Sequence, residues 1–182
     1  MKKHVRCIAP LLVLASLSAC GLAPEEQYER ALKSYATSDF VTARLDLISA
    51  LEEDPRNVRY LTLLAETQIA MKDGEGAVFT LDRLAGLNVQ SEELVIMRAE
   101  AEVLRGHHDQ ALTLVDGLGS ASAHRIAAMA QIGLKNPDAA RKAFAAGMAA
   151  NPRDPDLLAT FARFELAMGK LADAQSYASS AL

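Results

Sequence analysis

The sequence has no tryptophan and only 2 cysteines in 182 residues, which excludes a small scaffold stabilised by many disulfides. Its 6 prolines and 10 glycines are too few for a low-complexity linker protein. The 19 lysines and arginines stand against 23 aspartates and glutamates, and the net charge of −4 argues against a nucleic-acid partner. The remaining composition, 51% hydrophobic and 23% charged, is that of one globular domain with a sizeable core.

Common catalytic motifs are also missing. The sequence contains no H-E-x-x-H, G-x-S-x-G or G-x-x-x-x-G-K-[ST] pattern. Gly117 and Gly119 follow no strand pattern, so they predict the end of a helix rather than a phosphate-binding loop. His107 and His108 have no carboxylate at metal-ligand spacing and predict a solvated turn. We therefore expect a protein that is not an enzyme and that binds no metal and no cofactor.

The first twenty residues are typical of a secretory signal, because three basic residues precede a short apolar run over residues 7–17. The run ends in Leu-Ser-Ala-Cys20, which resembles the lipobox of bacterial lipoproteins. That resemblance implies a signal peptide over residues 1–19, lipidation of Cys20, and a short tether over residues 20–23. Because Gly21 rather than aspartate follows the cysteine, the resemblance also implies the outer membrane, with the mature chain facing the periplasm.

Cleavage at this site changes both the charge and the thiol content. Three of the 19 basic residues lie in the signal, which leaves 16 against 23 acidic residues and a net charge of about −7. Cys7 leaves with the signal and Cys20 carries lipid, so the mature domain keeps no free thiol for a disulfide, a metal or a nucleophile. Two or more acyl chains anchor a protein stably, so the expected location is a membrane surface.

The rest of the chain is an internal repeat. Alanines recur at intervals of 34, 34, 29 and 34 residues, at Ala43, Ala77, Ala111, Ala140 and Ala174. Twelve residues before each stands another alanine, at Ala31, Ala65, Ala99, Ala128 and Ala162. Small residues at such positions let two antiparallel helices approach closely. A period of 34 is that of the tetratricopeptide repeat (TPR), which this pattern resembles. A generic alanine-rich helical bundle is the alternative.

The resemblance implies an all-α, TPR-type solenoid over residues 24–182. Helix start signals such as Asn136-Pro137-Asp138 agree, and no stretch shows the alternation of a strand. We expect five helix-turn-helix hairpins at about 24–57, 58–91, 92–120, 121–154 and 155–182. The third is five residues short, which predicts an early stop near Gly117.

By the same resemblance, positions 2, 5, 9 and 12 of each repeat line a concave groove formed by the first helices. The candidate groove residues are Tyr28, Leu32, Tyr35, Arg59, Glu66, Ile69, Ile96, Glu100, Val103, Arg125, Met129, Ile132, Arg163 and Leu166. Leu32, Ile69, Val103, Ile132 and Leu166 would form an apolar floor with charges along one side. Such a surface suits an extended or helical peptide, with apolar anchors for affinity and charges for register.

These features predict a non-catalytic scaffold or adaptor, anchored to the outer membrane, that binds periplasmic or outer-membrane proteins. Two groups of TPR lipoproteins are similar: those of the exosortase (PEP-CTERM) exopolysaccharide systems, and the pilotin-like proteins that escort a type IV pilus secretin. The alternative is a self-associating spacer that forms a homo-oligomer through an open apolar face at Leu171 and Ala174. That face would equally suit a longer repeat array, a bound partner, or exposure to water.

Overall fold

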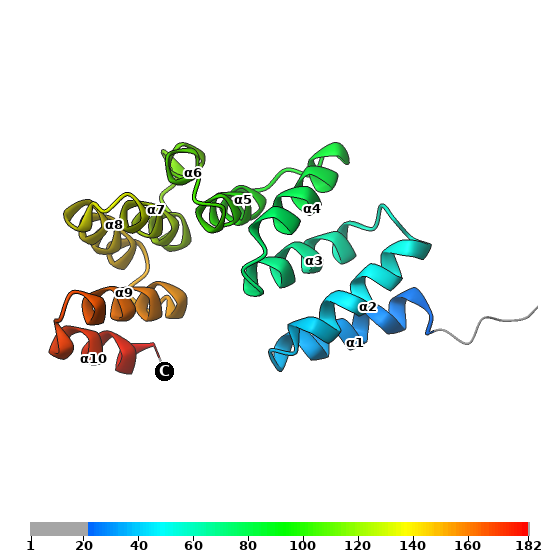
Figure 1. The fold of residues 1–182 in the computed structure, drawn as a ribbon, viewed down its shortest axis with the longest axis horizontal. Coiled ribbons are helices and arrows are strands. Elements are labelled where there is room, and N and C mark those ends of the chain that lie inside the picture. The colour runs from blue at the N-terminus through cyan, green and yellow to red at the C-terminus, as the bar shows by residue number, and fades with distance from the viewer. Residues whose placement is uncertain (1–21, 182) are drawn as a thin grey trace, which may run out of the picture.

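The computed structural model describes residues 22–181. The predicted signal peptide and Cys20 lie outside the described residues. Within them the chain forms ten helices: α1 (Pro24–Ala36), α2 (Phe40–Glu53), α3 (Val58–Ala70), α4 (Gly74–Gly86), α5 (Glu92–Leu104), α6 (His108–Val115), α7 (Ala121–Gly133), α8 (Pro137–Ala150), α9 (Pro155–Ala167) and α10 (Leu171–Ser180). Figure 1 shows them as an arch that runs in chain order. The described part has no strand, which confirms the all-α prediction.

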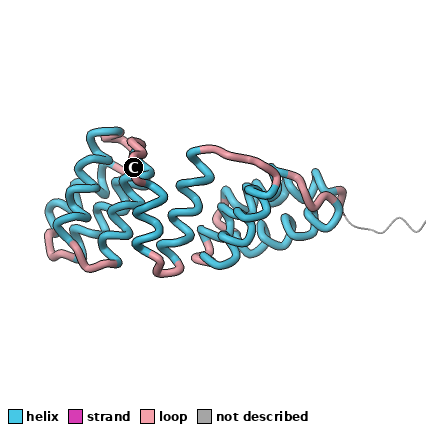
Figure 2. The backbone as a smooth tube through the Cα atoms, turned by 90° about the horizontal axis from the view of Figure 1, so that it is seen from above, coloured by secondary structure: helices cyan, strands magenta, loops and turns pink. Residues whose placement is uncertain are grey.

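The helices pair into five hairpins. Each odd-numbered helix packs on the even-numbered helix that follows it, and on the next odd-numbered helix of the series. The two sets of five alanines explain this arrangement, because all ten are buried and let the helices approach closely. Figure 2, seen from above, shows the resulting stack of antiparallel helices joined by short turns. The predicted solenoid of helix-turn-helix hairpins is therefore confirmed.

Local sequence signals fix where the helices begin. The side chains of Asp39, Asp73 and Asp154 each accept a hydrogen bond from a backbone N–H in the first turn of the helix that follows. Pro137 and Pro155 stand at the first helical position, where a missing N–H costs nothing.

The turn inside each hairpin has one residue in the left-handed backbone region, with φ between 61° and 82°. These residues recur at the same intervals as the alanines: Ser38, Lys72, Gly106, Lys135 and Gly169. The third hairpin differs at its exit, because α6 has only 8 residues and ends two residues before Gly117, whose φ is +75°. This early stop lies where the sequence predicts it.

The core is continuous along the arch in three clusters, which span α1 to α5, α5 to α7, and α7 to α10. In the last of these, the rings of Phe144 and Phe161 stack with centroids 4.5 Å apart. Phe161 stacks in turn on Tyr177 of α10. None of the helices in residues 22–181 is both long enough and apolar enough to span a membrane.

The prediction for the adjacent histidines is wrong for His107. Its Nδ1 atom lies 2.9 Å from the carboxylate of Glu102, which is buried in α5 and also accepts from Arg105. His108 is half-buried and packs against Gly133 of α7. The carboxylate five residues earlier comes within reach because the chain folds back sharply between α5 and α6.

Candidate functional site: the central groove

Two adjoining cavities, of about 360 and 480 Å³, lie on the inner side of the arch. Both are lined by Glu66 of α3, Met97 and Glu100 of α5, Arg125 of α7 and Asp156 of α9. We call them together the central groove. Its remaining lining residues are Tyr35, Ile69, Ala70, Lys72, Glu92, Glu93, Ile96, Ser120, Ser122, Ala159, Thr160 and Arg163.

All five first helices contribute to this groove, although they lie far apart in the sequence. Seven of the fourteen predicted residues line it: Tyr35, Glu66, Ile69, Ile96, Glu100, Arg125 and Arg163. Tyr35, near the end of α1, and Asp156, at the start of α9, line the same cavity, so the arch brings its two ends together here.

The groove is crossed by one enclosed ion pair. Arg125 donates from Nη2 to Glu100 Oε2 at 2.7 Å and from Nη1 to Glu100 Oε1 at 3.2 Å. The side chains are only 12% and 15% exposed. A two-pronged pair in this setting is strong and directional, so it fixes α5 against α7. Neither charge is then free for a partner.

Other carboxylates in the groove have no such cation. Glu66, Glu93 and Asp156 form no ion pair within residues 22–181, and Glu92 at the rim forms none either. Burial raises the pKa of the Glu66 carboxyl above its ordinary value, and the charge of Glu93 raises it further. The groove is therefore acidic, with Lys72 and Arg163 as its other cations.

The electrostatics at Tyr35 report the same field. Burial raises the pKa of the Tyr35 phenol, and the negative charges of Glu66 and Asp156 raise it further. A neutral phenol therefore faces carboxylates from α3 and α9 across the groove. Ile69 and Met97, both nearly buried, supply an apolar surface beside these charges.

Two predicted residues lie at the N-terminal rim instead. The guanidinium of Arg59 stands 4.9 Å from the centre of the Tyr28 ring and donates to Glu25 at 2.7 Å. Tyr60 also donates to Glu25 and lies against Tyr28, with ring centroids 5.0 Å apart. This cluster ties α1 to α3 and uses its own charges internally.

The other predicted residues are dispersed. Leu32 packs against the first core cluster, and Val103 and Met129 pack against the cluster between α5 and α7. Ile132 is exposed, and Leu166 lines a separate hollow near the C-terminal end. The five residues expected as an apolar floor therefore do not all line the central groove.

Sequence reasoning missed two contributors. Met97 is one position beyond Ile96 in its repeat, and Lys72 belongs to the turn between α3 and α4. The left-handed turn residues share the repeat spacing of the alanines, and that register was the signal for Lys72. Nothing in the sequence marks Met97, because its place depends on how α5 rotates.

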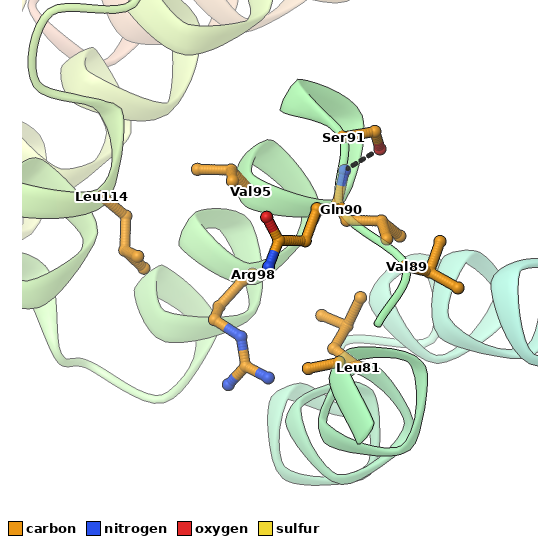
Figure 3. Close-up of a pocket in the computed structure, with 9 residues that line it drawn as sticks. Leu81, Val89, Gln90, Ser91, Val95, Arg98 and Leu114 are labelled. Carbon is orange, nitrogen blue, oxygen red and sulfur yellow. Dashed lines mark hydrogen bonds between the residues drawn. The ribbon is translucent and has the colours of Figure 1, made fainter. Parts of the chain in front are cut away.

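A smaller cavity of about 210 Å³ lies between α4, α5 and α6 (Figure 3). Leu81 and Leu114 approach it from α4 and α6, while Val95 and Arg98 line it from α5. Arg98 is paired with Asp82 of α4. The cavity has room for little more than one side chain and shares no residue with the central groove.

An apolar hollow of about 680 Å³ lies between α9 and α10. Leu166 and Leu171 line it and are largely exposed, together with alanines such as Ala174 and Ala178. This is the open face that the sequence predicts. No group of three or more histidine, cysteine or acidic side chains in the described part of the chain is placed to hold a metal ion.

Comparison with known proteins identifies the fold. No protein-family pattern matches the chain, and no curated protein sequence matches it. A thermophilic TPR protein of Thermus thermophilus, TTC0263, superposes with a TM-score of 0.72 at 21% identity, over 88% of this chain and 90% of that one. PilW, a type IV pilus biogenesis factor, superposes with a TM-score of 0.64 at 17% identity, over 87% and 76%. PilF of Pseudomonas aeruginosa gives 0.59 at 14%, over 86% and 74%. The chain thus has the tetratricopeptide-repeat fold.

Proposed function

We propose that this protein is a non-catalytic periplasmic adaptor, anchored to the outer membrane by lipid on Cys20, that binds a positively charged segment of a partner protein. The observation that carries the proposal is the central groove. Side chains from all five first helices converge there, and Glu66, Glu93 and Asp156 have no cation of their own within the described residues.

Binding would satisfy both halves of this surface. A lysine or arginine of the partner would pair with Glu66, whose half-buried carboxylate is costly to keep charged alone. An apolar side chain beside it would cover Ile69 and Met97. Electrostatic complementarity of this kind speeds association and sets register, while the apolar contacts supply affinity.

The fold supports a protein partner, and the N-terminal sequence supports the location. The basic start, the apolar run and the cysteine resemble a lipoprotein signal. PilF and the pilus biogenesis factor PilW share the fold, which favours pilus or secretin assembly as one pathway. Exopolysaccharide export is the second pathway, and the identity of the captured partner decides between them.

Affinity purification from detergent-solubilised membranes tests the groove. Arg59 and Arg125 are poor targets, because each is already held in an ion pair within the fold. The informative variant is Glu66→Lys with Glu93→Lys, which reverses two groove charges. Its matched control is Glu53→Lys with Asp116→Lys.

The control makes the same charge change at two exposed helix C-termini, where lysine is tolerated well. We expect the partner to be lost with the groove variant and retained with the control. Equal recovery with both, or recovery of this chain alone, contradicts the proposal.

The anchor has a separate test. Mass spectrometry of the N-terminal peptide from membranes should show acylated Cys20, and Cys20→Ser should release the chain from the membrane fraction. An intact segment over residues 1–19 in the mature protein would remove the anchor while leaving the groove proposal standing.

A second candidate function is self-association through the hollow between α9 and α10. It is favoured by the exposure of Leu166 and Leu171 on one apolar surface. Light scattering at increasing concentration distinguishes it. A dimer that Leu171→Glu dissociates supports this function, and a monomer at all concentrations rules it out.

A further inference from the structure

The outer face of α2 is apolar and open to solvent. Val41, Leu45 and Ile48 stand at i, i+4 and i+7, so they form one stripe along the helix. Their exposed fractions are 56%, 59% and 44%. Single exposed apolar residues are ordinary on a protein surface, but an aligned stripe on a single helix indicates a surface that contacts something.

The repeat supplies an internal comparison. In the register of the buried alanines, the positions of Val41, Leu45 and Ile48 recur in each second helix. The equivalent residues are Glu75, Phe79 and Asp82 in α4; Asp109, Thr113 and Asp116 at α6; Asp138, Lys142 and Ala145 in α8; and Ala172, Ser176 and Ser179 in α10. Every other hairpin is polar or small in at least two of the three positions. Solvent therefore suits this face in four hairpins, and only the first departs from it.

A single cation accompanies the stripe. Arg44 lies between Val41 and Ile48 on the same side of α2 and is half-buried. Its Nε atom is buried without a hydrogen-bond partner in the described residues. Apolar side chains with an arginine alongside are typical of helices that lie in the interface of a lipid bilayer, where the guanidinium reaches the phosphates.

The hairpin that carries the stripe is also the one nearest to the proposed anchor. Pro24, the first residue of α1, comes four residues after Cys20, and four residues span at most about 14 Å. The 14-residue α2 is antiparallel to α1 and is about 21 Å long. A lipid on Cys20 would therefore keep the whole first hairpin close to the bilayer surface.

We infer that the outer face of α2, formed by Val41, Arg44, Leu45 and Ile48, lies on a phospholipid surface and holds the solenoid in a fixed orientation on it. The inference rests on the anchor at Cys20 in the proposed function. It adds a second contact to the lipid chains, which leaves the central groove free for a partner.

The absence of tryptophan from the sequence makes the test direct, because one introduced tryptophan reports alone. The chain from Cys20 onward also has a single thiol, which can be coupled to vesicles of phosphatidylcholine that carry a maleimide lipid. Leu45→Trp places the reporter in the stripe. Thr113→Trp places it at the equivalent exposed position of α6 as the matched control.

We expect the emission of the Leu45→Trp chain to move to shorter wavelength on coupling. In vesicles of brominated phosphatidylcholine it should fall about twofold, as for a side chain buried about 5–10 Å in the interface. The Thr113→Trp chain should show neither change. Adding Val41→Ser and Ile48→Ser should abolish the response at position 45 while helical circular dichroism stays the same.

Three results would overturn the inference. The first is no spectral response at position 45, and the second is an equal response at position 113. The third is a shift at position 45 that grows with protein concentration without vesicles, which would assign the stripe to a second copy. Because the tether is made chemically, these results do not depend on whether cells lipidate Cys20, and they do not involve the groove partner.

Discussion

Arg125 and Glu100 join α7 to α5 by two parallel hydrogen bonds at the inner surface of the arch, the shorter of them 2.7 Å. The pair is structural, because both side chains are largely enclosed and satisfy each other. It also explains why the acidity of the groove comes from other carboxylates. The groove is built on a fixed internal charge pair, with its unpaired charges presented to a partner.

Breaking this pair on one side should be costly. Arg125→Leu leaves Glu100 enclosed without a counter-charge, and we expect a loss of about 3 kcal/mol in the free energy of unfolding. The double variant Arg125→Leu, Glu100→Leu should recover most of that loss. Urea denaturation measures both, and a single variant as stable as the parent would show that the pair contributes nothing.

The stacked rings in the C-terminal half of the solenoid give a second prediction. Phe144 is fully buried and stacks on Phe161, so Phe144→Ala should destabilise the chain by about 3–5 kcal/mol. Phe79→Ala removes an equally large ring that is mostly exposed, and it should change stability by about 0.5 kcal/mol or less. Comparable losses for the two in thermal unfolding would contradict the assignment of the core.

The turns inside the hairpins predict a gain. Lys135 holds φ at 62°, a conformation that strains a residue with a Cβ atom, so Lys135→Gly should raise stability by about 0.5–1 kcal/mol.

The exposed Lys142, in the middle of α8, is the matched control. Lys142→Gly should lower stability by about 1 kcal/mol. Gly106 has open space where a methyl group would be added but holds φ at 82°, so Gly106→Ala should cost stability through the backbone alone. Opposite signs for Lys135 and Lys142 in the same denaturation assay are the decisive result.

The raised pKa of Glu66 has a defined consequence for stability. The folded chain holds a proton on Glu66 more tightly than the unfolded chain, so this group lowers stability as pH rises from the ordinary carboxyl value of 4.5 through the raised pKa. The cost then persists at neutral pH. Glu66→Gln should therefore raise the melting temperature at pH 7 and have little effect below pH 4.5. A melting temperature that falls at pH 7 would show that Glu66 has a stabilising partner.

Much of this fold could be predicted from the sequence because its main determinant is periodic. Ala43 and Ala31 mark the close helix contacts of the first hairpin, and their equivalents recur along the chain. The register then places one face of each first helix on the inner side of the arch, which is why Glu66 and Arg163 were expected near each other and do line one cavity.

Other features depend on geometry that periodicity does not specify. Whether Arg125 pairs with Glu100 or remains free depends on rotamers across two helices. The contact of His107 with Glu102 arises from one tight turn between α5 and α6. The distinction between paired and unpaired carboxylates, on which the proposed function depends, therefore came only from the structure.

Site-specific photo-cross-linking in living cells tests the central claim most directly. A benzophenone amino acid in place of Tyr35 would stand inside the groove, and the same residue in place of Phe79 would stand on the outer surface. The account predicts that the Tyr35 position alone forms an adduct with a second protein, through a peptide rich in lysine or arginine. That adduct should disappear when Glu66→Lys and Glu93→Lys are added. Adducts only from the Phe79 position, or only between copies of this chain, would contradict it.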